Sequence, residues 1–114
     1  MEKIFEQALL YDFYGELLND HQKEIYEEYV LDNLSLSEIA EEHGISRQGV
    51  HDLIKRADKA LNQYEAKLGL IRKFVNIKDK VNQINEISVT MAHGADRDKA
   101  ENIISITNEI LDEL

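Results

Sequence analysis

The chain has 114 residues, of which 43% are hydrophobic and 32% charged, and its formal net charge is −10 at pH 7. This length fits one domain, or a small domain with a helical extension, and the lack of proline favours an all-α fold. The absence of cysteine excludes disulfides, thiolate zinc sites and cysteine nucleophiles. No apolar run reaches the roughly 18 residues of a membrane span, and the charged N-terminus lacks a secretory signal pattern. We therefore expect a cytoplasmic protein without a membrane span.

The charge is unevenly distributed along the chain. Residues 1–45 hold twelve acidic and two basic side chains. Residues 46–80 hold four acidic and nine basic side chains, and residues 81–114 hold seven acidic and two basic ones. The middle segment is therefore basic, with a net charge of +5. Salt screens charges beyond about 10 Å at 0.1 M, so a local basic patch can attract phosphate on an acidic protein.

The first two predicted helices cover about residues 3–18 and 20–31. In the first, apolar residues recur at spacings near 3.6 and should face the core. These residues are Ile4, Phe5, Ala8, Leu9, Phe13, Leu17 and Leu18. Asn19 or Asp20 is expected to cap the second helix. The inward residues of that helix are predicted to be Ile25, Tyr29 and either Val30 or Leu31.

A helix-turn-helix is predicted between residues 35 and 61. Ser35 should cap the third helix, with Glu38 completing a capping box, and Ser46 should cap a fourth helix that begins at Arg47. Between them, Gly44 supplies the positive φ angle of a sharp turn. The buried positions of this motif are predicted to be Ile39, Ala40, Val50, Leu53, Ile54, Ala57 and Leu61.

The C-terminal segment has a heptad pattern that predicts a helical hairpin of residues 70–93 against 97–113. The seam of its first helix is Leu70, Phe74, Ile77, Val81, Ile84, Ser88 and Met91, and that of its second is Ile103, Thr107, Ile110 and Leu114. Gly94 is the expected C-cap and Asp96 the expected N-cap between them. The domains would then be residues 1–68 and 69–114. Apolar surface left over on the hairpin, including Ile104, Ile106 and Leu111, would meet either the first helix of the same chain or a second copy, and we expect a homodimer.

Two resemblances rest on these motifs. The stretch "LLNDHQKEIYEEYVLDNLSLSEIAEEHGISRQGVHDLIKRADKAL", residues 17–61, resembles region 4 of bacterial sigma factors, whose helix-turn-helix reads promoter DNA. Over nearly the whole chain, "LLYDFYGELL", "LSLSEIAEEHGISRQGVHDLIKRA" and the long C-terminal helices resemble the small YlxM-type helix-turn-helix family of bacteria. The genes of that family lie beside those of the signal recognition particle GTPases. The resemblance therefore implies an accessory or regulatory role in that pathway.

The candidate nucleic-acid contacts lie at the start of the fourth predicted helix. They are Ser46, Arg47, Gln48, His51, Lys55, Arg56 and Lys59. Arg47 is suited to bidentate bonds with guanine and Gln48 to bonds with adenine. Lys55, Arg56 and Lys59 are better suited to phosphate contacts, which position a protein without reading sequence.

No pattern in the sequence predicts an enzyme, a cofactor or a metal site. His21, His43, His51 and His93 show no ligand spacing such as HxxxH, and we interpret them as surface or helix-end residues. The carboxylates of Glu24, Glu27 and Glu28 are interpreted as a solvated helix face.

Two hypotheses from different classes follow. The first is a regulator of transcription that binds nucleic acid, with DNA favoured because the A-form major groove of RNA is deep and narrow. The second is an accessory protein that uses the helix-turn-helix as a scaffold and binds the signal recognition particle GTPase or its RNA.

Overall fold

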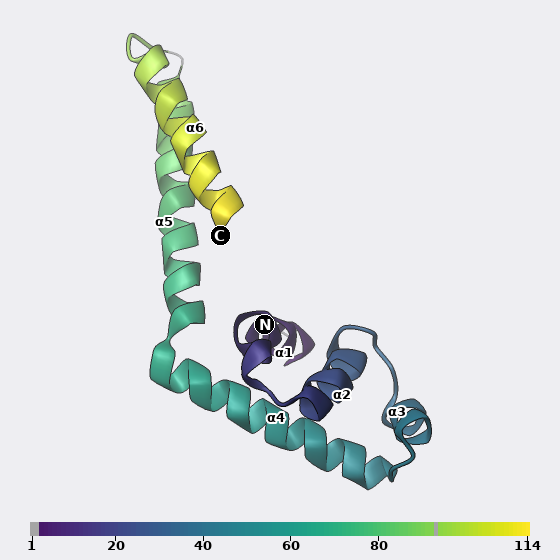
Figure 1. Cartoon of the computed structure of the whole chain (residues 1–114). Coiled ribbons are helices and arrows are strands. Elements are labelled where there is room, and N and C mark those ends of the chain that lie inside the picture. The colour runs from purple at the N-terminus through teal and green to yellow at the C-terminus, as the bar shows by residue number, and fades with distance from the viewer. Residues whose placement is uncertain (1–2, 93) are drawn as a thin grey trace. The chain divides into compact units, whose positions relative to one another are not determined.

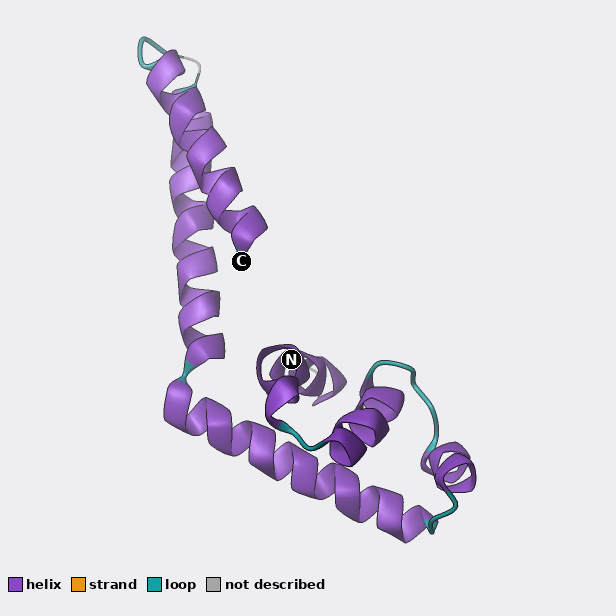
Figure 2. Cartoon of the chain, viewed as in Figure 1, coloured by secondary structure: helices purple, strands orange, loops and turns teal. Residues whose placement is uncertain are grey.

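The computed structural model describes residues 3–92 and 94–114, and within these ranges every regular element is helical (Figures 1 and 2). The helices are α1 (Lys3–Tyr14), α2 (Asp20–Val30), α3 (Leu36–His43), α4 (Arg47–Leu68), α5 (Leu70–Met91) and α6 (Arg97–Glu113). A short 3₁₀ turn, η1 (Gly15–Leu17), follows α1. The predicted all-α class is confirmed.

The chain divides into two compact units, and each is described by itself. The first, here the helix-turn-helix unit, extends to Ile71, and the second, here the hairpin unit, is Arg72–Leu114. In the helix-turn-helix unit, α1, α2 and α3 each pack against α4. The chain changes direction sharply between α3 and α4, as the predicted motif requires (Figure 1).

The helix caps of the helix-turn-helix unit follow the sequence prediction. The Asn19 side chain accepts a hydrogen bond from the Gln22 backbone N–H, and the Gln22 side-chain oxygen accepts one from the Asn19 backbone N–H, which makes a capping box at α2. Ser35 and Glu38 form the equivalent box at α3. Each such cap contributes about 1 kcal/mol, since it satisfies backbone donors that have no partner within the helix. The ends of these short helices are therefore fixed locally.

The predicted inward face of α1 is only partly correct, since Leu18 is buried and Ala8, Leu9 and Phe13 are half-buried. The buried side chains are Gln7, Leu10, Tyr11, Tyr14 and, beyond the helix, Leu18, whereas Ile4, Phe5 and Leu17 are exposed. The helix also ends at Tyr14, and the chain tightens into η1 instead of continuing to residue 18. The ring of Tyr11 lies so close to Gly15 that a Cβ there would be 2.8 Å from it. Both tyrosines place large rings in the interior: Tyr11 stacks on Tyr26 with 5.7 Å between ring centroids, and the Tyr14 hydroxyl donates a hydrogen bond to Glu65.

The core of the helix-turn-helix unit gathers around α4. Its largest fully buried side chains are Tyr14, Tyr26, Ile25, Ile39, Leu61 and Val50. Each aliphatic member contributes about 1.5 to 3 kcal/mol by leaving water. Ile39, Ala40, Val50, Ile54, Ala57 and Leu61 are buried as predicted, and Leu53 is half-buried. On α2, Ile25 and Val30 are buried as predicted, and Tyr29 is half-buried against the core. Tyr26 is fully buried although it was not predicted to be, and Leu31 is exposed.

The hairpin unit has a narrow and partly polar interior. Val81 and Ser88 of α5 and Ala100 and Thr107 of α6 are buried. Asn85 donates hydrogen bonds to Thr107 Oγ1 at 2.8 Å and to Asn108 Oδ1 at 3.1 Å. The Asn85 hydrogen bonds therefore link α5 to α6 beside a small buried interior.

Only part of the predicted heptad seam lies inside the hairpin unit. Of the predicted α5 seam, Val81 and Ser88 are buried, whereas Leu70, Ile77, Ile84 and Met91 are exposed. Asp96 stands at the N-cap position of α6, but its side chain makes no capping hydrogen bond. His93 lies outside the described residues.

Candidate nucleic-acid interface

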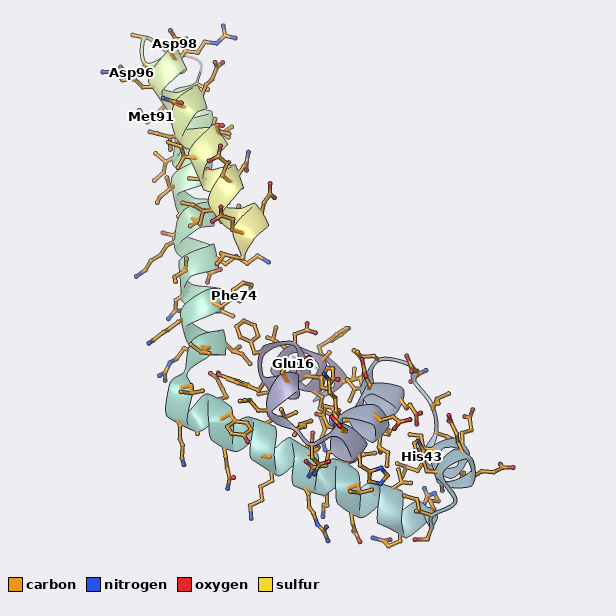
Figure 3. The ribbon with its side chains drawn as sticks, viewed as in Figure 1. Glu16, His43, Phe74, Met91, Asp96 and Asp98 are labelled. Carbon is orange, nitrogen blue, oxygen red and sulfur yellow. The ribbon has the colours of Figure 1, made fainter. Side chains whose placement is uncertain are left out.

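The predicted contact residues all lie on the solvent side of α4 or at its N-cap. Val50, Ile54, Ala57 and Leu61 hold the opposite side in the core. Ser46, Arg47, Gln48, His51, Lys55, Arg56 and Lys59 are all exposed. Figure 3 shows nitrogen-tipped side chains along the side of α4 that faces away from α1 and α2. The arrangement leaves a basic helix surface open to a ligand.

The turn before α4 is built by Gly44 and Ser46. Gly44 has φ of 66° and ψ of 31°, which is the left-handed region predicted for it. Ser46 Oγ accepts a hydrogen bond from the Gly49 N–H at 2.9 Å, so its hydroxyl serves as the N-cap of α4. Arg47 and Gln48 therefore occupy the first turn of a helix whose start is well defined.

Asp52 interrupts the basic surface. Its carboxylate accepts a hydrogen bond from the Gln48 side-chain amide at 3.0 Å, and its Oδ1 lies 3.8 Å from His51 Nδ1. The amide of Gln48 must leave this partner before it can pair with a base. Asp52 is itself a group that can accept a hydrogen bond from cytosine N4.

Lys3 is a further cation that the sequence reading missed. With His51 and Lys55 it lines a concavity of about 100 Å³ between α1 and α4, to which Tyr29 of α2 and Leu36 of α3 also contribute. Lys3 is one of only two basic residues among the first 45, and this isolated positive charge in an acidic segment was the one sequence feature that could have pointed to it. Its side chain adds positive charge beside the middle of the α4 surface.

A buried polar network holds α1 and α2 on α4 beneath this surface. Asp58 of α4 accepts a hydrogen bond from the Tyr26 hydroxyl at 2.5 Å and two from the Gln7 side-chain amide at 3.0 and 3.1 Å. Burial and the neighbouring Asp58 carboxylate raise the pKa of Tyr26 well above its usual range, so the phenol stays protonated and donates. Three helices are thereby fixed behind the exposed side chains.

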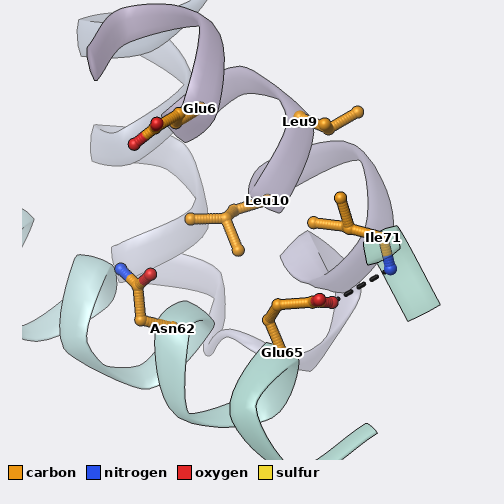
Figure 4. Close-up of a pocket in the computed structure, with 6 residues that line it drawn as sticks. All are labelled: Glu6, Leu9, Leu10, Asn62, Glu65 and Ile71. Carbon is orange, nitrogen blue, oxygen red and sulfur yellow. Dashed lines mark hydrogen bonds between the residues drawn. The ribbon is translucent and has the colours of Figure 1, made fainter. Parts of the chain in front are cut away.

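A second concavity, of about 260 Å³, lies on the helix-turn-helix unit away from the contact residues (Figure 4). It is lined by Glu6, Leu9, Leu10, Asn62, Glu65 and Ile71. Glu65 already accepts a hydrogen bond from the Ile71 backbone N–H at 3.0 Å and one from Tyr14 Oη at 2.6 Å. Its carboxylate is therefore occupied by structural bonds.

Acidic side chains of α3 lie near the turn at Gly44 that precedes α4. Glu38, Glu41 and Glu42 are exposed, and Glu38 is engaged in the capping box with Ser35. Of the histidines, His51 is exposed on α4, while His43 is half-buried and lies 2.9 Å from Glu28. The sequence suggested a solvated carboxylate at Glu28, but this side chain is largely buried and paired with His43.

Comparison with known proteins agrees with this geometry. Residues 1–103 match the family model described as "Putative helix-turn-helix protein, YlxM / p13 like". The chain belongs to this family. A relative from Thermoanaerobacter pseudethanolicus is 44% identical over 107 residues, which cover 94% of this chain and 89% of the relative. The YlxM protein of Bacillus subtilis is 46% identical over 88 residues, 77% of this chain and 80% of that protein.

A third relative, from Caldanaerobacter subterraneus, is 53% identical over 79 residues, which are 69% of this chain and 68% of that protein. The family confirms the resemblance inferred from the central motif, and a helix-turn-helix family suggests nucleic-acid binding. In the described part of the chain, no helix combines the length and apolarity that crossing a lipid bilayer requires.

Proposed function

We propose that this protein is a regulator that binds duplex DNA by placing the N-terminal half of α4 in the major groove. The observation that carries the proposal is the exposure of all seven predicted contact residues on the second helix of a helix-turn-helix. Helices of this kind present their first residues to base edges while flanking cations contact the backbone. Arg47 and Gln48 would read bases, and Lys55, Arg56 and Lys59 would contact phosphates.

The charge distribution supports weak, salt-sensitive binding. The basic surface of α4 stands beside exposed carboxylates of α3 and contains Asp52. Phosphate contacts must outweigh this negative charge, so affinity should fall steeply as counterions are added. Lys3 contributes one more phosphate contact next to Lys55 in this proposal.

Salt titration tests the proposal. Simultaneous replacement of Lys55, Arg56 and Lys59 by alanine should flatten the slope of log K against log salt by about 2.7, at roughly 0.9 per phosphate on duplex DNA. Arg47→Ala should cost about 1 to 3 kcal/mol at one base position and little elsewhere. An unchanged slope would contradict the proposal and favour the accessory-scaffold alternative.

Two controls sharpen this titration. Alanine at Lys67, Lys73 and Lys80 removes the same charge from exposed positions outside the proposed contacts, and it should change the slope much less. Asp52→Asn removes a negative charge from the contact surface, so it should strengthen binding to DNA of any sequence. Opposite effects of Asp52→Asn and the Lys55 variant set would locate the DNA on this side of α4.

The proposed active form is a homodimer formed by the hairpin unit. On α5, Ile77, Ile84 and Met91 recur every seven residues and are 46%, 47% and 40% exposed. On α6, Ile106, Ile110 and Leu114 are also exposed. A two-helix interior of Val81, Ser88, Ala100 and Thr107 is small, and a second hairpin would supply the missing partner for the heptad positions. Two recognition helices could then meet half-sites about 34 Å apart.

The mass of the protein in solution tests the dimer. Light scattering should give twice the 13.2 kDa of one chain, and Ile77→Asp with Ile84→Asp should give single chains. Replacement of exposed Phe5 of α1 by serine is the matched control, because the alternative is that α1 of the same chain covers the hairpin. A monomeric native protein would overturn the dimer.

The pathway is proposed from the family alone. The family's genes lie beside those of the signal recognition particle GTPases, so the regulated process would be that pathway, and its RNA is a second possible ligand of the basic surface. Competition of a bound DNA duplex by the particle's RNA or by its GTPase tests this. If neither competes nor is co-purified, the pathway part fails and DNA binding stands.

A further inference from the structure

Three side chains of α2 and one of α3, which are two histidines and two glutamates, lie close together where α2 meets the end of α3. Ligand atoms of Glu24, Glu28 and His43 all lie within 4.8 Å of one another. The ring of His21 lies edge-on to that of His43, with 6.0 Å between the ring centroids. His21, Glu24 and Glu28 share one face of α2 because they are three and four residues apart. His43 approaches from the last turn of α3 (Figure 3).

The group carries more negative charge than its one internal ion pair uses. His43 Nε2 lies 2.9 Å from Glu28 Oε2, and the two side chains are only 13% and 12% exposed. Within residues 3–92 and 94–114, no lysine or arginine forms an ion pair with Glu24 or Glu28. The histidine–glutamate pair uses one carboxylate, and the Glu24 carboxylate and the His21 ring lie beside it.

We propose that His21, Glu24, Glu28 and His43 form a binding site for a divalent transition-metal ion such as Zn²⁺. Imidazole nitrogen and carboxylate oxygen are both accepted zinc ligands, at about 2.0 to 2.2 Å. Two imidazoles bound tetrahedrally at that distance have ring centroids about 5 Å apart, which is close to the 6.0 Å of His21 and His43. The side chains of His21 and Glu24 are exposed, so neighbouring groups leave them room to turn toward an ion held by Glu28 and His43.

The ion would replace the proton that joins His43 to Glu28. Zinc binds the neutral imidazole, so metal affinity falls as pH falls and binding releases protons. The Glu28 carboxylate, by its hydrogen bond and its charge, raises the pKa of His43, with smaller contributions from the charges of Glu24 and Glu42.

The site would connect the two helices that support the turn. His43 immediately precedes Gly44, and α2 packs against both α3 and α4. A bound dication would crosslink α2 to α3 and neutralise carboxylates on an acidic side of the helix-turn-helix unit. The proposed site does not depend on whether α4 binds DNA.

Titration of the full-length, chelator-treated protein with zinc chloride tests the site. Calorimetry should show one ion per chain, and Co²⁺ in place of Zn²⁺ should give the intense visible absorption of a low-coordinate site. His43→Gln and Glu28→Gln should each weaken binding by at least about tenfold, since even the loss of an outer partner of a metal ligand costs 10- to 100-fold. Glu24→Gln should weaken it too, and because Glu24 is exposed this variant does not risk misfolding.

Matched controls separate this site from adventitious surface binding. Glu41→Gln removes an exposed carboxylate of α3, and His51→Gln removes an exposed imidazole of α4. Neither should change the metal affinity. If zinc fails to bind, or if all three ligand variants bind it as well as the native protein, the site does not exist.

Discussion

The hydroxyl of Tyr14 donates a hydrogen bond to Glu65 Oε1 at 2.6 Å and thereby joins α1 to the C-terminal part of α4. The Tyr14 hydroxyl oxygen also accepts a hydrogen bond from the Leu70 backbone N–H at 3.2 Å, and Glu65 Oε1 accepts one from the Ile71 backbone N–H. Two N–H groups at the start of α5, which lack partners within the helix, are satisfied in this way. Burial and the Glu65 carboxylate raise the pKa of Tyr14, so it remains a donor.

Tyr14→Phe should therefore destabilise the helix-turn-helix unit. It removes a hydrogen bond to a charged acceptor, which is worth about 1.5 to 3 kcal/mol, and it leaves the Leu70 N–H without a partner. Urea unfolding followed by circular dichroism measures the loss. Tyr64→Phe is the matched control, because Tyr64 packs against Tyr14 with 6.1 Å between ring centroids and is half-buried. Equal stability of the native protein and Tyr14→Phe would contradict the account.

The local features of this fold could be predicted from the sequence, because each depends on a few neighbouring residues. The caps at Asn19, Ser35 and Ser46 and the left-handed Gly44 all lie where the pattern placed them. The inward face of α1 could not, since Tyr11 and Tyr14 are buried only because partners from α2 and α4 receive them. Hydrophobic periodicity considers only the spacing of apolar residues along one helix, so it does not predict that a tyrosine is buried by a partner from another helix.

Gly44→Ala should cost about 1 to 2 kcal/mol, the penalty of a left-handed conformation for a residue with a Cβ. No atom lies within 4 Å of the position that a Cβ would take, so crowding adds nothing and the measured loss isolates the backbone term. Asparagine tolerates this conformation better, so Gly44→Asn should recover part of the loss in thermal unfolding. If alanine and asparagine are equally harmful, backbone strain is not the cause.

Asp58→Asn should destabilise the unit by about 2 to 3 kcal/mol. An asparagine oxygen can still accept the Tyr26 hydroxyl bond, but its NH₂ group would then face the donating amide of Gln7. Asp52→Asn on the exposed side of the same helix is the control and should change the unfolding free energy by no more than about 0.5 kcal/mol. Similar losses in both variants would mean that the buried network contributes nothing special.

The candidate sites differ in how far sequence could reveal them. Exposure of Arg47 and Lys55 follows from the helical period set by Val50 and Ile54, so it was predictable. Lys3 and the pairing of His43 with Glu28 depend on which helices become neighbours. No spacing within one segment encodes such contacts, and the histidines accordingly looked like isolated surface residues.

The His43–Glu28 pair should make stability depend on pH in a defined direction. Glu28 raises the pKa of His43 in the folded protein above the unfolded value of about 6.5, so folding favours the protonated imidazole. The stabilisation is fully present below pH 6.5 and is lost as the pH rises through the folded pKa. With a chelator present to exclude metal, the urea concentration at the unfolding midpoint should therefore decrease as the pH is raised above about 6.5. His43→Gln and Glu28→Gln should both remove this dependence, whereas Glu41→Gln should keep it. A native protein whose midpoint rises across that range would show that the imidazole is held neutral instead.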